Sequence, residues 1–277
     1  MSVREQAVVF DCDGARMVGI ATQPDRPSDV GVLILVGGRQ CRTGSHRQFT
    51  LLARRLAGAD YCSFRFDFRG MGDSEGERRS FEALDADIAA AVSALRAACP
   101  SVRRVVLWGL CDAATAAALY WQRARDPLVV GLCLANPWLR SEESLARTRV
   151  RHYYTGRVAD LQFWRKLLRG NVRPLLALRE YLDHWRVARR PSGAVGFRQA
   201  MLAGLEAFPG PILLLLSGRD LTASEFVDSL SAAGLDALLR QPNIRCAELP
   251  GADHTFSQSA WQHEAEEAVV GWLSAIR

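Results

Sequence analysis

Short apolar runs alternate along most of the chain with segments whose apolar residues recur every three or four positions. The runs have the length of strands and are bounded by glycines or polar turns. We expect strands over residues 6–12, 16–22, 30–36, 61–68, 105–109, 129–135, 212–216 and 244–249. We expect helices over residues 45–56, 80–98, 113–123 and 259–275. This alternation predicts an α/β fold with a mostly parallel, doubly wound sheet covered on both faces.

One long stretch interrupts the alternation. About 75 residues without a convincing strand separate the predicted strands at 129–135 and 212–216, and a structureless loop of that length is uncommon in a compact domain. Residues 161–168 and 175–185 have helical spacing. We therefore predict a helical cap insertion at 138–206, carried by a core formed from residues 1–137 and 207–277.

Positive charge is concentrated in the predicted insertion. The whole chain has a formal charge of +5, whereas the segment from Trp138 to Leu205 has thirteen arginines and Lys166 against five acidic residues. That segment is therefore +9 and the rest of the chain −4. Such charge is typical of a solvated outer face or of a surface that docks an acidic partner. It lacks a nucleic-acid recognition motif, so we expect no nucleic-acid binding.

The composition limits where the protein works and what it binds. No window reaches the roughly 18 consecutive apolar residues of a membrane span, and the first residues do not resemble a signal peptide. We therefore expect a cytoplasmic protein without a membrane span. The seven cysteines are an odd number and form no CxxC pair, which argues against a disulfide framework and a zinc site. We expect neither a metal nor a cofactor.

One cysteine has a setting that favours chemistry. The sequence GLCDA at 109–113 follows an apolar run and precedes an Ala-rich segment, which is the spacing of a sharp strand-to-helix turn that presents a nucleophile. Ala113 stands where that turn usually has a second glycine. Cys111 would lie at a helix N-terminus, where the helix dipole favours a thiolate. The N–H of Asp112 would face a developing oxyanion. A free thiol in such a chain is otherwise a small apolar residue.

A cysteine nucleophile needs a base and a group that orients the base. His254 lies in the loop after the last predicted strand, and Asp220 follows the preceding strand. Loops at the carboxyl ends of parallel strands meet in one crevice, so both side chains can reach Cys111. His46 is an alternative base, and Asp220 could instead be a turn or N-cap residue.

Three further residues complete the candidate site. The glycine pair that ends in Gly38 follows the apolar run at 30–36 and lets the backbone approach a substrate closely. The N–H of Arg39 is the candidate for a second oxyanion donor. Gly38 and Trp138 are candidate substrate contacts.

Three segments carry a family resemblance. They are GGRQ and GSHRQF within 37–49, FDFRGMGDSEG at 66–76 and VLWGLCDAAT at 106–115. Together they resemble the serine aminopeptidase-like α/β-hydrolases, and among these the exosortase A system-associated hydrolases, in which a cysteine at the elbow is usual. The resemblance implies an α/β-hydrolase fold and a triad of Cys111, Asp220 and His254, in the chain order of nucleophile, acid and base. It implies a mainly architectural role for the second segment.

The site residues predict an acyl-transfer enzyme that hydrolyses an ester or thioester through an acyl-cysteine intermediate. An acyltransferase that moves an acyl or aminoacyl group between carrier-protein or coenzyme A thioesters is the alternative, because an acyl thioester reacts readily with amines and thiols. A non-catalytic scaffold is a third hypothesis. The expected partners are a small-molecule acyl substrate and, for transfer, an acidic acyl carrier protein docked on the basic insertion.

Overall fold

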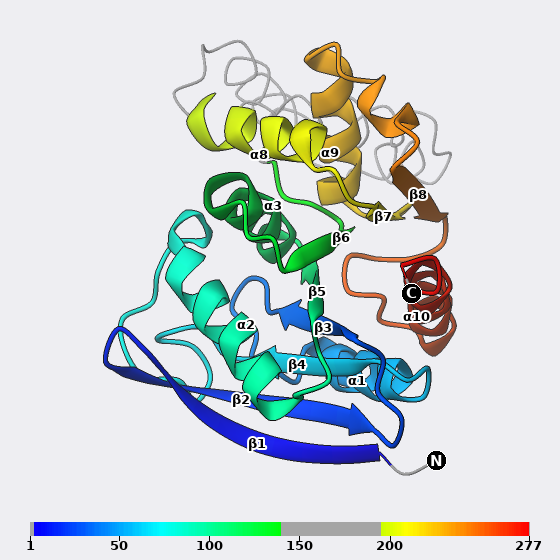
Figure 1. The fold of residues 1–277 in the computed structure, drawn as a ribbon. Helices are drawn as coiled ribbons and strands as arrows, with labels where there is room; N and C mark the ends of the chain where they lie inside the picture. The colour runs from blue at the N-terminus through cyan, green and yellow to red at the C-terminus, as the bar shows by residue number, and fades with distance from the viewer. Residues whose placement is uncertain (1–2, 140–194, 277) are drawn as a thin grey trace, which may run out of the picture.

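An eight-stranded sheet with helices on both faces forms the body of the protein (Figure 1). The computed structural model describes residues 3–139 and 195–276. The strands are β1 (Val3–Cys12), β2 (Ala15–Pro24), β3 (Val30–Leu35), β4 (Cys62–Phe66), β5 (Arg104–Leu110), β6 (Val129–Ala135), β7 (Ile212–Ser217) and β8 (Ile244–Leu249). Their order in the sheet is β1-β2-β4-β3-β5-β6-β7-β8. The pairs β1–β2 and β2–β4 are antiparallel, and all later pairs are parallel.

The main helices of the described residues are α1 (Gln48–Ala57), α2 (Asp85–Ala98), α3 (Asp112–Ala124), α8 (Val195–Ala207), α9 (Leu221–Ala232) and α10 (Ser259–Leu273). The strands and helices expected within the described residues are thus confirmed, with two differences at helix starts. Short 3-10 turns, Ser45–Arg47 and Phe81–Ala83, precede α1 and α2 where continuous helices were expected. The first turn is separate because His46 and Arg47 have positive φ angles of 53° and 62°. None of the helices in the described ranges is long and apolar enough to cross a membrane.

Strand β5 shows why a fully apolar run becomes a central strand. Its side chains alternate, so Val105 and Leu107 join the core cluster that includes residues of α2, α3, α8 and α9. Val106 and Trp108 join the opposite cluster, which includes residues of α1 and α10. Both faces of the strand are therefore covered, as a parallel sheet requires.

Helix α8 belongs to the predicted insertion but packs into the core. A Cβ placed on Gly204 would lie 2.8 Å from Cβ of Gln122, so the backbone of α8 lies directly against α3. Met201 and Leu205 of α8 are buried in the larger core cluster. The expected helices at 161–168 and 175–185 lie outside the described residues, so the cap at 138–206 stays a prediction.

Two buried carboxylates hold the loops at the carboxyl edge of the sheet. Asp67, directly after β4, accepts hydrogen bonds from the backbone N–H groups of Arg42 (2.5 Å) and Asp73 (3.1 Å) and pairs with the Arg42 side chain. Asp87 of α2 accepts from the backbone N–H of Arg69 (3.0 Å) and from its Nε (2.6 Å). These contacts tie the loop after β3 to the loop after β4, in line with an architectural role for the segment at 66–76.

Replacement of Asp87 by alanine should destabilise the fold by about 3 kcal/mol, because it removes the buried partner of an arginine that is itself buried. The Arg69 side chain is only 6% exposed, and its remaining partner Asp13 is largely exposed. Urea denaturation measures the effect. Glu75→Ala, which breaks the exposed pair with Arg16, is the control and should leave the midpoint nearly unchanged. Equal midpoints for the two variants would contradict the prediction.

Candidate active site

Cys111 occupies a sharp turn between β5 and α3. Its backbone angles are φ 62° and ψ −124°, a conformation that is strained for a residue with a side chain. A Cβ on Gly109 would lie 2.6 Å from the carbonyl oxygen of Ala113, so only glycine fits two residues before the cysteine. The methyl group of Ala113 is itself buried, at 1% exposure. The alanine in place of a second glycine therefore leaves the turn tight.

Hydrogen bonds fix this turn to the end of β6. The N–H of Cys111 donates to the Ala135 carbonyl (2.9 Å), and the Cys111 carbonyl accepts from the N–H of Trp138 (3.2 Å). The Thr115 hydroxyl donates to the Trp138 carbonyl (2.5 Å). Trp138 thus lies beside the turn through its backbone, and its contact with a substrate remains a prediction.

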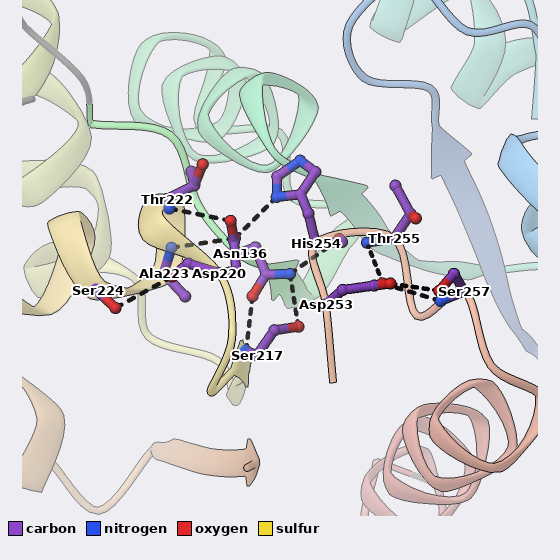
Figure 2. A network of polar contacts seen from close by, with 10 residues as sticks. All are labelled: Asn136, Ser217, Asp220, Thr222, Ala223, Ser224, Asp253, His254, Thr255 and Ser257. Atoms are coloured by element: carbon purple, nitrogen blue, oxygen red, sulfur yellow. Dashed lines mark hydrogen bonds and ion pairs between the residues drawn. The ribbon is translucent and has the colours of Figure 1, made fainter. Parts of the chain in front are cut away.

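Asp220 caps a helix and holds His254 with the same carboxylate (Figure 2). It is the N-cap residue of α9, where Oδ1 accepts from the N–H of Thr222 (3.1 Å) and Oδ2 from the N–H of Ala223 (3.2 Å). Oδ2 also lies 2.8 Å from Nδ1 of His254. The two roles weighed for this aspartate are therefore compatible, and the helix N-terminus fixes the carboxylate that orients the imidazole.

The imidazole of His254 connects Asp220 to Cys111. Burial favours the neutral ring, but hydrogen bonds to Asp220 and Cys111, together with the charges of both groups, outweigh burial and raise the pKa of His254 to about 10. The ring is therefore held as an imidazolium beside the sulfur at neutral pH. His46, the alternative base, is exposed on the turn before α1. The structure thus brings together Cys111, His254 and Asp220.

Asn136 is a positioning residue that the sequence reasoning missed. It is fully buried after β6, and its side-chain amide donates to the Ser217 hydroxyl (2.9 Å) and to the His254 carbonyl (3.1 Å) (Figure 2). Its Oδ1 accepts from the N–H of Ser217 (2.8 Å). Asn136 therefore joins the ends of β6 and β7 to the loop that carries His254. The available signal was an asparagine directly after an apolar strand.

The glycine loop after β3 touches the turn at Cys111. A Cβ on Gly37 would lie 2.2 Å from the Leu110 carbonyl oxygen, and the N–H of Gly38 donates to Oδ1 of Asp112 at 2.6 Å. The side chain of Arg39 is exposed, and its N–H remains a predicted oxyanion donor. Because the N–H of Gly38 lies beside the turn at Cys111, it is a further candidate for the second oxyanion donor.

A cavity of about 320 Å³ opens beside Asp112, which is the size of a small-ligand pocket. Its apolar lining consists of Val36, Phe68, Met71, Phe81 and Leu84. Polar groups come from Arg78, Arg79, Ser80 and Asp112. Within the described part of the chain, no group of three or more His, Cys, Asp or Glu residues is placed to hold a metal ion.

Alkylation by iodoacetamide at pH 7 should be faster at Cys111 than at the exposed Cys41 and Cys246, because Cys111 lies at the N-terminus of α3 beside the His254 ring. Asp220→Asn removes a hydrogen bond and a charge that raise the pKa of His254, so the Cys111 rate should fall by about tenfold or more. Peptide mapping by mass spectrometry gives each rate. The buried Cys62 and Cys133 stay unlabelled if the variant is folded. An unchanged alkylation rate of Cys111 in the folded Asp220→Asn variant would contradict the pairing of Cys111 with His254.

Gly109→Ala should lower the free energy of unfolding by about 1–3 kcal/mol and abolish the rapid alkylation of Cys111, because the new methyl group overlaps the backbone of α3. Thermal melting and the alkylation rate measure both effects. Gly271→Ala in α10 is the matched control, since a Cβ there meets nothing within 4 Å. Identical behaviour of the two variants would show that the turn does not need glycine.

Comparisons with known proteins agree on the fold. The esterase Pf2001 of Pyrococcus furiosus is 15% identical, with a TM-score of 0.66 over 98% of this chain and 91% of that chain. The haloalkane dehalogenase DatA of Agrobacterium tumefaciens is 19% identical, with a TM-score of 0.62 over 99% and 97%. Est1E of Butyrivibrio proteoclasticus, solved with ferulic acid bound, is 16% identical, with a TM-score of 0.62 over 97% and 98%. At such low identity these likenesses concern the fold alone.

The sequence itself places the chain in a family. No curated protein matches it, and the resemblance to the exosortase A system-associated subgroup stays a prediction. The model described as "Alpha/beta hydrolase family" matches residues 32–272, which include the turn at Cys111 and the loops of Asp220 and His254. Because that match spans most of the sequence and the sheet and helices have the expected arrangement, the chain belongs to the alpha/beta hydrolase family.

Proposed function

We propose that this protein is a cysteine-dependent acyl-transfer enzyme that hydrolyses an ester or thioester through an acyl-cysteine intermediate. The observation that carries the proposal is the strained turn that presents Cys111 at the start of α3, beside a His254 ring held by Asp220. Two proteins of similar fold are described as an esterase and as Est1E with ferulic acid bound, which supports carboxylic ester chemistry.

In the acylation step, the Cys111 thiolate attacks the carbonyl carbon of the substrate, and the carbonyl oxygen becomes an oxyanion. The N–H of Asp112 and an N–H of the glycine loop, from Gly38 or Arg39, stabilise that charge. When the tetrahedral intermediate collapses, the bond to the leaving alkoxide or thiolate breaks, and the leaving group takes the proton of His254.

Deacylation regenerates the Cys111 thiolate and the His254 imidazolium. Neutral His254 takes a proton from water as the water oxygen attacks the thioester of Cys111, and the acid leaves as the carbon–sulfur bond breaks. Asp220 keeps Nδ1 of the ring protonated throughout, so that the other ring nitrogen exchanges the proton. The oxyanion donors act in both steps.

Transfer to a thiol or amine is the second candidate, because the intermediate is itself a thioester. Arg78 and Arg79 line the cavity beside Asp112, and exposed arginines favour a carrier with phosphate or carboxylate groups. An acidic acyl carrier protein docked on the basic segment at 138–205, in the cytoplasm, is the matching partner. Exosortase-associated hydrolases are the subgroup we propose for the chain.

Incubation with a panel of p-nitrophenyl esters and acyl thioesters, followed by intact-mass spectrometry, tests the proposal. An acyl adduct should form on the protein, and turnover should fall by at least about a thousandfold in Cys111→Ala. Cys246→Ala, which removes an exposed thiol elsewhere, is the control and should retain activity. Turnover that is unaffected by Cys111→Ala, or the absence of any adduct and turnover, would contradict the proposal and favour a non-catalytic scaffold.

The fate of the acyl group separates hydrolysis from transfer. Release of only the free acid, with a thiol or carrier acceptor present, supports hydrolysis. Appearance of the acyl group on the acceptor supports transfer.

A further inference from the structure

The carboxylate of Asp112 has a place in the site that the proposed reaction does not use. Only the backbone N–H of this residue serves as an oxyanion donor in that reaction, yet the side chain lies half-buried between the turn at Cys111 and the glycine loop. A carboxylate at this position would repel the negative charge that develops on the substrate oxygen.

The Asp112 side chain takes up a donor that an oxyanion would need. Its Oδ1 accepts from the N–H of Gly38 at 2.6 Å and would lie 2.8 Å from a Cβ on Gly37, so it sits against the backbone of the loop. Oxyanion donors act on an oxygen about 2.7–3.1 Å away. The N–H of Gly38 therefore cannot hold the substrate oxygen while it holds this carboxylate oxygen.

A positive charge that acts on the carboxylate lies in the adjoining cavity. Arg78 and Asp112 both line that cavity, and Arg78 is exposed on the loop before α2. Burial raises the pKa of the Asp112 carboxyl, whereas the N–H groups of Gly38, Ala113 and Asp112 itself and the charge of Arg78 each act to lower it. The guanidinium therefore attracts the carboxylate from within the cavity that both residues line.

We propose that the Asp112 carboxylate closes the oxyanion hole of the free protein and opens it by turning from the Gly38 N–H toward Arg78 as the carbonyl oxygen of the substrate enters. This inference rests on the proposed acyl-transfer function and assigns the second oxyanion donor to Gly38. Asp112 is then a positioning residue through its side chain, and Arg78 is its partner in the open state. This gate, the Asp112 carboxylate on the Gly38 N–H, slows every reaction of Cys111 that forms an oxyanion. It does not slow reactions of the thiolate that form none.

Two reactions of Cys111 separate the stabilisation of an oxyanion from the reactivity of the thiolate. Acetylation by p-nitrophenyl acetate passes through an oxyanion, whereas alkylation by iodoacetamide is a displacement at a saturated carbon and forms none. Both reactions need the thiolate, so the ratio of their rate constants cancels any change in the thiolate population. Asp112→Asn keeps the shape of the side chain but replaces a charged acceptor with a weaker neutral one, so the ratio should rise by about five- to tenfold at pH 7.5.

The rise in the ratio of acetylation to alkylation caused by Asp112→Asn should become smaller as the pH falls. The titratable and charged groups near Asp112 are Arg78 and Arg79, which line the same cavity, the neighbouring Cys111, and His254 beside Cys111. Protonation of Asp112 removes the charge that holds the Gly38 N–H, so the advantage of Asp112→Asn should shrink as the pH falls into the range where this carboxyl becomes neutral. A purely structural role of the side chain would give no such trend.

Arg78→Gln and Arg79→Gln form a matched pair, because both remove one positive charge from the same cavity. The ratio should fall about threefold or more in Arg78→Gln, which loses the open-state partner, and change little in Arg79→Gln. An unchanged or lower ratio in folded Asp112→Asn overturns the gate. If that variant does not fold, equal ratios in the two arginine variants overturn it. A wild-type Cys111 that is alkylated but never acetylated would instead overturn the proposed function, and the gate with it.

Discussion

The left-handed backbone of Cys111 is the constraint on which the site depends. A non-glycine residue in such a conformation costs about 1–3 kcal/mol, and the surrounding structure must supply that free energy. The hydrogen bonds of Cys111 to Ala135 and Trp138 and the close packing of Gly109 against the start of α3 stabilise this conformation. In return the sulfur lies at a helix N-terminus with its side chain only partly covered. The strained turn and the reactivity that we propose for Cys111 therefore have the same structural origin.

The rest of the site follows from a sheet whose strands end at one edge. Asp220 begins α9 after β7, and His254 follows β8, so neither residue is near Cys111 in sequence. Asn136 joins the two loops by hydrogen bonds that a buried amide must make in any case. Asp220 likewise satisfies the N-terminus of α9 with the carboxylate that orients the imidazole. The stability of the fold and the alignment of the proposed catalytic groups therefore rely on the same contacts.

The sequence allowed most of the fold and the three central residues to be predicted, for definite physical reasons. Parallel strands buried on both faces are continuous apolar runs, and strand ends meet at one edge, so Cys111, Asp220 and His254 could be placed together. The partner of the Asp112 side chain could not be predicted, because it depends on how closely the loop of Gly38 approaches the turn. Asn136 was not predicted because its hydrogen bonds depend on how closely the ends of β6, β7 and β8 approach one another. The packing of α8 on α3 was not predicted, because it depends on which helices the tertiary fold brings together.

An NMR titration of the His254 ring, in the wild type and in Cys111→Ala, measures directly whether Cys111, His254 and Asp220 are coupled. The contacts predict that the wild-type imidazole titrates near pH 10, and that its pKa falls in Cys111→Ala because the hydrogen bond and the charge of the sulfur are lost while those of Asp220 remain. A wild-type ring that titrates near its ordinary value of 6.5, or a pKa that is the same in both proteins, would contradict the coupling of Cys111, His254 and Asp220.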